Sequence, residues 1–168
     1  MKYRLLSIFG ALLITASFCI TSQAADFTSI EGTYVLESRQ LPDGTILTPP
    51  AIAGLYVLSE GYMSLNRAAK DTQGNITSRS AVGTYTISGS TYSLELIYNA
   101  VNDGTKISYD FDKKSGSSEM TMVDGNVEMK IPLVDNLYGS FSPDSFTAMT
   151  RGEFIDKWVK VKWKGSGG

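Results

Sequence analysis

The sequence contains no histidine and only one cysteine among its 168 residues. Without histidine, Ser-His-Asp and Cys-His nucleophilic sites, His-ligated zinc and His-ligated haem are excluded. The one cysteine, Cys19, lies in an apolar N-terminal stretch, so the remaining chain has no disulfide partner and no thiolate ligand for a metal. We therefore predict no catalytic residues, no cofactor and no metal site.

Strongly basic segments are also lacking. The chain carries 15 Lys and Arg against 17 Asp and Glu, which gives a formal net charge of −2. Binding to a nucleic-acid backbone depends on a basic surface that neutralises phosphates. Nucleic acid is therefore not an expected partner.

The N-terminus has the pattern of a secretory signal peptide over residues 1–24. Lys2 and Arg4 precede an apolar run at 5–16, and small residues lead up to Ala24. The apolar run is shorter than the roughly 20 residues of a membrane-spanning helix. We expect cleavage after Ala24, export to the periplasm with secretion as the alternative, and no membrane span in the mature form.

Turn-forming dipeptides divide the rest of the chain into short segments rich in Tyr, Val, Ile, Thr and Phe, which are typical of strands. Gly and Asn tolerate the positive φ of tight hairpin turns. The predicted turns are Asp43-Gly44, Glu60-Gly61, Gly74-Asn75, Gly89-Ser90, Asp103-Gly104, Gly116-Ser117 and Asp124-Gly125.

Several segments between these turns alternate apolar and polar residues. The pattern is clear at 92–98, 107–112 and 127–131, and a period of two places one set on one face of a strand. Sheets with one apolar and one wet face are typically antiparallel. Residues 151–162 fit either a strand or a helix.

We predict an all-β domain over residues 25–164, followed by a flexible Gly/Ser tail at 165–168. Eight to ten strands joined by short connections favour an antiparallel up-and-down barrel, because closure removes both exposed edges. A two-sheet sandwich is the alternative. It needs longer crossovers, for which the candidates lie near 39–54, 66–79 and 135–145.

Four short motifs resemble the bacterial lipocalin-like domains, a family of calycin-type barrels. They are Gly32-Thr33-Tyr34, the hairpin at 54–64, Gly83-Thr84-Tyr85 and Lys157-Trp158. The resemblance covers most of the mature chain. It implies a small calyx that holds an apolar molecule.

Tyr34 stands where lipocalins have the tryptophan that closes the barrel floor. The resemblance also implies that a basic residue near the end of the chain packs over this ring. Arg151, Lys157 and Lys160 are the candidates.

The barrel is either hollow, with a pocket lined by Met and aromatic carbon, or filled by its own side chains. A continuous void of about 300 Å³ or more favours a ligand carrier. Arg67 either meets a ligand carboxylate at the barrel mouth or is a solvated loop residue. The predicted inward set is Tyr34, Leu36, Met63, Leu65, Tyr85, Ile87, Tyr92, Leu94, Leu96, Tyr98, Ile107, Tyr109, Phe111, Met120, Met122, Met129 and Ile131. The predicted ligand-binding residues are this set without Ile87, Ile107 and Ile131, together with Arg67.

We expect non-enzymatic binding of a small hydrophobic or amphipathic molecule. One alternative is a filled barrel that acts through its outer surface as an interaction or inhibitor module, with exposed loops at 42–50 and 136–144. Another is an isomerase or cyclase, which needs an inward carboxylate beside a tyrosine. The predicted register places Glu37, Glu95, Asp110 and Glu128 outside, which disfavours the enzyme.

Overall fold

The computed structural model describes residues 26–71 and 73–162. The predicted signal peptide and Gly/Ser tail lie outside the described residues. A short 3₁₀ helix, η1 (Phe27–Ile30), precedes the strands. The strands are β1 (Gly32–Gln40), β2 (Ile46–Leu47), β3 (Ile52–Ser59), β4 (Tyr62–Lys70), β5 (Ile76–Ser88), β6 (Thr91–Asn102), β7 (Ile107–Asp110), β8 (Lys114–Val123), β9 (Asn126–Lys130), β10 (Leu137–Phe141), β11 (Ser145–Thr150) and β12 (Phe154–Lys160).

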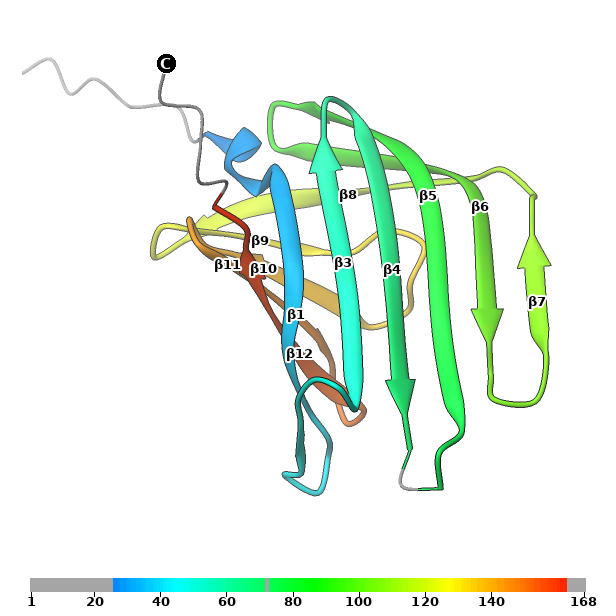
Figure 1. Ribbon diagram of the computed structural model, residues 1–168. Coiled ribbons are helices and arrows are strands. Elements are labelled where there is room, and N and C mark those ends of the chain that lie inside the picture. Colours follow the sequence, from blue (N-terminus) through cyan, green and yellow to red (C-terminus); the bar gives the residue numbers. More distant parts are fainter. Residues whose placement is uncertain (1–25, 72, 163–168) are drawn as a thin grey trace, which may run out of the picture.

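The strands close into an antiparallel barrel (Figure 1). Neighbours along the sheet run β12-β11-β10-β9-β8-β6-β5-β4-β3-β1, and β12 pairs with β1 to complete the ring. The short strands β2 and β7 lie outside this ring, paired with β1 and β6. The predicted barrel is confirmed, and the ambiguous C-terminal segment is the strand that closes it.

Tight turns set the register of the hairpins. Glu60 and Gly61 connect β3 to β4 with φ values of 50° and 80°, and Asp124 and Gly125 repeat this geometry between β8 and β9. Two consecutive positive φ values match the right-handed twist of the paired strands. The predicted turn at 116–117 is wrong, because these residues lie within β8.

Two irregularities change which side chains point inward. The β1–β12 register shifts between Leu36 and Ser38, and the β5–β6 register shifts between Val82 and Gly83. Each inserts one unpaired residue in a strand, which reverses the inward and outward alternation beyond it. The first shift turns Arg39 toward the barrel interior, opposite Asp156.

The short helix η1 lies at the end of the barrel that is at the top of Figure 1. Ile30 and Tyr34 are fully buried there, and the Tyr34 hydroxyl donates a 2.8 Å hydrogen bond to the Ile30 carbonyl. The Tyr85 hydroxyl hydrogen-bonds the Glu31 carboxylate. Of the three basic candidates, Lys160 is the one whose ammonium lies over the Tyr34 ring, at 5.6 Å from its centre.

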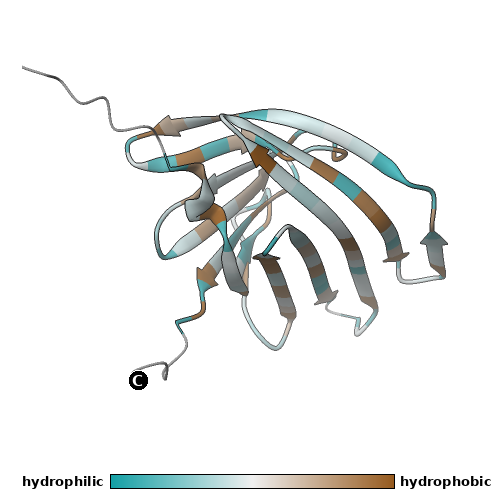
Figure 2. Cartoon of the chain, turned by 90° about the horizontal axis from the view of Figure 1, so that it is seen from above, coloured by the Kyte–Doolittle hydropathy of each residue, from teal (hydrophilic) through white to brown (hydrophobic). Residues whose placement is uncertain are grey.

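Hydrophobic residues alternate with hydrophilic ones along several strands (Figure 2), and the buried apolar residues form one core cluster. Phe141 and Phe146 stack with ring centres 4.2 Å apart, and Tyr34 meets both rings edge-on. Such aromatic pairs are worth about 0.5–1.5 kcal/mol beyond the area they bury. Among the described residues, no helix is long and apolar enough to cross a membrane.

Candidate functional site

A cavity of about 280 Å³ occupies the other half of the barrel. Its wall is mainly apolar and comes from strands on opposite sides of the ring. The apolar lining residues are Tyr56, Met63, Leu65, Ala81, Leu94, Leu96, Ile131, Pro132, Val134, Leu137, Phe146, Ala148, Phe154 and Trp158. The volume lies just below the roughly 300–1,000 Å³ typical of ligand pockets. It is also slightly smaller than the void of about 300 Å³ expected of a ligand carrier, so the space limits a ligand to a small molecule.

Polar residues gather toward the mouth of the cavity, near the end of β4 and the start of β5 at the bottom of Figure 1. They are Arg67, Arg79, Asp135, Thr150, Glu153 and Asp156. Apolar depth with a polar rim is the usual layout of a site that orients an amphipathic guest.

Asp156 is the acidic centre of this mouth and is only 1% exposed. Arg39 holds it with two hydrogen bonds, Nε to Oδ1 at 2.6 Å and Nη2 to Oδ2 at 2.7 Å. Arg67 adds a third from Nη1 to Oδ2 at 3.1 Å. The Phe154 ring supports both guanidinium groups, which lie 4.3 and 5.3 Å from its centre. The carboxylate is thus saturated by arginine donors.

Arg67 and Arg79 sit directly opposite each other on β4 and β5. Burial, followed by repulsion from Arg39, lowers the pKa of Arg67 from its ordinary value. Burial also lowers the pKa of Arg79, whose Nε donates to the neutral Asn99 amide oxygen at 3.0 Å. The mouth therefore holds two desolvated cations side by side.

Trp158 forms part of the cavity wall, and its indole N–H is buried with no hydrogen-bond partner among the described residues. The benzo edge of the indole lies against Gly54, where an added Cβ would come within 2.7 Å of Cη2. Glycine at this position lets β3 and the indole approach closely. The unpartnered N–H is a donor that a bound molecule could use.

Five of the predicted ligand-binding residues line the cavity: Met63, Leu65, Arg67, Leu94 and Leu96. Ile131, which was predicted to point inward, also lines it. The structure thus places Arg67 at the cavity mouth rather than in a solvated loop.

Six further predicted residues point inward but pack in the core away from the cavity. Tyr34, Leu36, Tyr85, Tyr92, Met120 and Met129 are each at most 5% exposed, and Ile87 packs against them. Burial raises the pKa of Tyr92 to about 12, and burial also raises the pKa of Tyr34 and Tyr85. These side chains close and stabilise the barrel.

The predicted inward orientation is wrong for four residues. Ile107 and Tyr109 lie on β7, outside the ring, and Phe111 follows them at 71% exposure. Tyr98 follows the β6 register shift, so its ring packs with Phe111 on the outer side. Met122 shares a face with buried Met120 and pairs with buried Val127, but it is 41% exposed close to the β8–β9 turn and does not line the cavity.

The cavity residues that the sequence did not single out include Arg79, Asp156 and Trp158. Asp156 has the same strand parity as Phe154 and Trp158, so its inward position follows once 151–162 is taken as a strand. Arg79 has the same parity as Ala81, which is buried. For both Arg79 and Asp156, the sequence shows a charged residue at a position that shares its strand face with apolar residues.

The four acidic residues predicted to lie outside do not enter the cavity lining. Glu37 and Glu128 are exposed, and Glu95 and Asp110 form surface ion pairs with Lys113 and Lys114. The predicted loop at 136–144 is largely strand β10, whereas 42–45 is an exposed turn.

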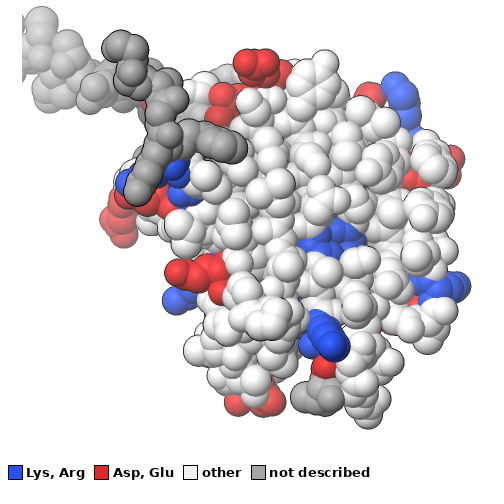
Figure 3. Space-filling model, in the orientation of Figure 1, with Lys and Arg blue, Asp and Glu red and all other residues white. Residues whose placement is uncertain are grey.

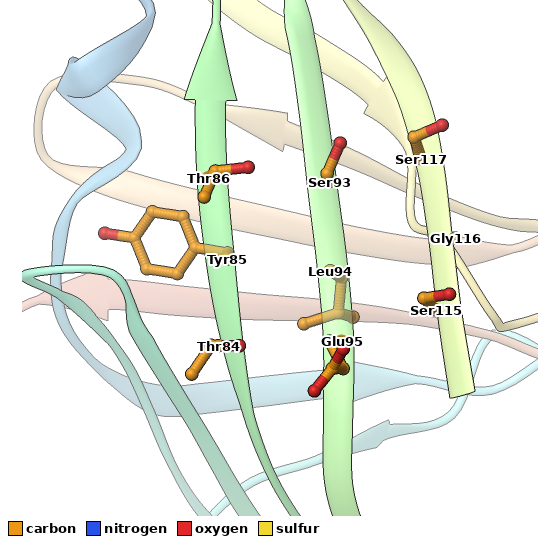
Figure 4. Close-up of a pocket in the computed structure, with 9 residues that line it drawn as sticks. All are labelled: Thr84, Tyr85, Thr86, Ser93, Leu94, Glu95, Ser115, Gly116 and Ser117. Carbon is orange, nitrogen blue, oxygen red and sulfur yellow. The ribbon is translucent and has the colours of Figure 1, made fainter. Parts of the chain in front are cut away.

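A second depression lies on the outer face of β5, β6 and β8 (Figure 4). Hydroxyl side chains such as Thr84, Ser93 and Ser115 line it, together with Glu95. It is open to solvent and offers little apolar surface, whereas the internal cavity is enclosed by the barrel wall. In the view of Figure 3 charged groups are scattered and form no continuous patch of one sign.

The fold and the cavity define a closed antiparallel barrel with an internal pocket and an arginine-bearing mouth. The chain is similar in fold to a lipocalin-like protein from Bacteroides uniformis, with 15% identity, coverage of 79% of this chain and 99% of the other, and a TM-score of 0.36. The barrel assignment itself comes from the strand pairing. No protein-family model matches the sequence, and no curated protein matches it significantly.

Proposed function

We propose that the barrel binds a small hydrophobic or amphipathic molecule non-covalently in its internal cavity. The observation that supports this most directly is the 280 Å³ space between the apolar wall and the polar mouth. Packed barrels of this size can fill their interiors completely, so a retained space has to be accounted for. Filling it with apolar surface gains about 25 cal/mol per Å², before ordering costs.

Binding without catalysis is the activity that the site supports best. Among the described residues Asp156 is the one buried carboxylate, and both of its oxygens are engaged by arginine. A general base needs an accessible lone pair within reach of the substrate. Asp156 therefore positions Arg39 and Arg67 rather than moving protons.

We also propose that the protein works outside the cytoplasm, in the periplasm, after removal of residues 1–24. The basic start, the apolar run and the small residues up to Ala24 support this. N-terminal sequencing of the protein from its own host tests it. A mature chain that starts at Ala25 is expected, and an intact Met1 would contradict the proposal.

Native mass spectrometry of protein purified from its own host tests the binding function. We expect a small molecule to co-purify with the wild-type chain and to be absent from Ala148→Leu, because Ala148 is 7% exposed and lines the cavity. Met149→Leu is the matched control, since Met149 is an exposed neighbour on the same strand. Equal retention by Ala148→Leu, with a circular dichroism spectrum like that of the wild type, would contradict an internal site.

A second candidate function is protein contact through the outer surface. Tyr109 and Phe111 stack with ring centres 6.3 Å apart and are 63% and 71% exposed. Exposed stacked aromatics are typical of contact surfaces. A host protein that co-purifies with the wild type and is lost on Tyr109→Ser/Phe111→Ser substitution would favour this role. Unchanged co-purification would remove it.

A further inference from the structure

We infer that the molecule bound in the cavity is an anion, with an oxyanion headgroup held between Arg67 and Arg79 and a short apolar tail directed into the barrel. The inference rests on the proposed binding function and specifies its ligand class. The headgroup chemistry is shared by carboxylates, sulfate esters and phosphate esters.

The first support is the charge imbalance inside the mouth. Arg39, Arg67 and Arg79 face one buried carboxylate, Asp156, and within the described residues only Arg39 and Arg67 pair with it. Three guanidinium groups against one carboxylate leave two positive charges. Buried charges are normally paired, because taking an ion out of water is costly. The site is therefore short of negative charge.

The second support is the placement of the two arginines. Arg67 and Arg79 are direct cross-strand neighbours in the β4–β5 ladder, and both line the cavity. Like charges directly opposite each other on one face of a sheet destabilise the pair. A single oxyanion between them would accept hydrogen bonds from both guanidinium groups and remove the repulsion. Arginine forks match such groups in geometry.

Asp135 and Glu153 also line the mouth, but they do not supply the missing charge. Both are exposed, and neither forms an ion pair with the three arginines. Solvent and salt screen exposed carboxylates strongly.

The inner part of the cavity determines the chemistry and the size of the ligand's tail. Met63, Leu94 and Leu96 form an apolar wall, and Trp158 adds the buried indole N–H without a partner. A volume of about 280 Å³ limits the tail to a short chain or a single ring system. One weakly polar atom on the tail could accept the indole hydrogen bond.

Matched ligand series test the charge directly. Octanoate, octyl sulfate and octyl phosphate share a tail with octan-1-ol, and benzoate and 1-naphthoate share rings with benzyl alcohol and 1-naphthol. Isothermal titration calorimetry on the wild type is expected to show about tenfold or tighter binding for the anion of at least one pair. The preference is expected to shrink in high salt. Comparison of the carboxylate, sulfate and phosphate arms identifies the headgroup.

Arg79→Gln tests the assigned residue, because glutamine can still donate a hydrogen bond to Asn99. We expect it to abolish the preference for the anion over the matched alcohol. Arg151→Gln, at an exposed position, is the matched control. A preference that survives Arg79→Gln would overturn the assigned site.

A ligand-free measurement keeps the inference testable. If Arg79 has no counter-ion until an anion binds, Arg79→Gln is expected to melt at the same temperature as the apo wild type or higher. The substitution removes a partly buried cation that Arg67 repels. A lower melting temperature than Arg151→Gln would overturn the inference. Equal binding of alcohols and anions also overturns it but leaves the proposed function intact. Binding of neither series overturns both.

Discussion

The ammonium of Lys160 on β12 lies over the ring of Tyr34 on β1, 5.6 Å from its centre, and donates to the Ser29 carbonyl at 3.2 Å. The lysine stem crosses Gly32, where an added Cβ would meet Cε at 2.3 Å. One side chain thus ties the last strand of the barrel to the first strand and to the segment that closes its floor. Glycine at position 32 makes room for this crossing.

This relationship predicts the effect of removing the charge. Lys160→Met keeps much of the stem but loses the cation–π contact and the bond to Ser29. The free energy of unfolding is expected to fall by about 0.5–1 kcal/mol. Urea denaturation followed by far-UV circular dichroism measures it. Lys157→Met, on the exposed face of the same strand, is the control and is expected to change little.

The Tyr34 hydroxyl gives a second prediction. Tyr34→Phe leaves the buried Ile30 carbonyl without its 2.8 Å donor. The expected loss is about 1–3 kcal/mol, because an unsatisfied buried acceptor loses its solvation as well as its bond. Tyr138→Phe, at a 47% exposed site, provides the comparison. Equal stability of the two variants would show that the hydroxyl bond does not hold the floor.

Loss of the Asp156 carboxylate is expected to be among the most destabilising single changes. Asp156→Asn leaves the partly buried Arg39 and Arg67 without a counter-charge, and removing one partner of a buried ion pair costs up to about 3–5 kcal/mol. Asp144→Asn is the matched control, because its 2.9 Å pair with Lys162 is exposed and worth at most about 1 kcal/mol. Chemical denaturation of both variants gives the comparison. Similar losses would contradict a buried charge network.

Buried tyrosines make the barrel sensitive to alkali. Burial raises the pKa of Tyr92 to about 12, and Tyr34, Tyr56 and Tyr85 also have raised pKa values. An unfolded tyrosine ionises near pH 10. A raised folded pKa contributes stability that is complete below about pH 10 and is lost as the pH rises through about 12.

We therefore expect cooperative alkaline unfolding in this window, with near-UV tyrosinate absorbance and loss of circular dichroism rising together. In Tyr92→Phe, unfolding in this pH window releases one proton fewer. The free energy of unfolding is therefore expected to fall less steeply with pH than in the wild type. Ionisation of all tyrosines before any loss of structure would contradict the burial.

The strand pattern was predictable where the ladder is regular. Leu94 and Leu96 alternate with polar neighbours, and both point into the barrel as expected. The same alternation fails at Tyr98, because the β5–β6 register shift beside it reverses the faces. A bulge leaves no mark in a period-two pattern when apolar residues flank it on both sides. The apolar pattern of Ile107, Tyr109 and Phe111 likewise matched a barrel strand, although β7 pairs only with β6.

The charged part of the site was less predictable for a different reason. Arg67 could be placed at a strand end by parity, but its partner Asp156 is 89 residues away in the chain and meets it only when the barrel closes. Arg79 and Trp158 belong to the site through the same closure. Sequence pattern assigns faces to strands, whereas the cavity and its charge balance depend on which strands meet across the ring.

Methyl-labelled methionine NMR tests the central claim most directly. Met63 lines the cavity, whereas Met122 and Met149 are 41% and 39% exposed and do not line it. On titration with octanoate, octan-1-ol and the ring compounds, the account predicts that a bound ligand shifts the Met63 methyl resonance and leaves those of Met122 and Met149 in place. Shifts confined to the two surface methionines, or no shift with any compound, would contradict a binding site inside the barrel.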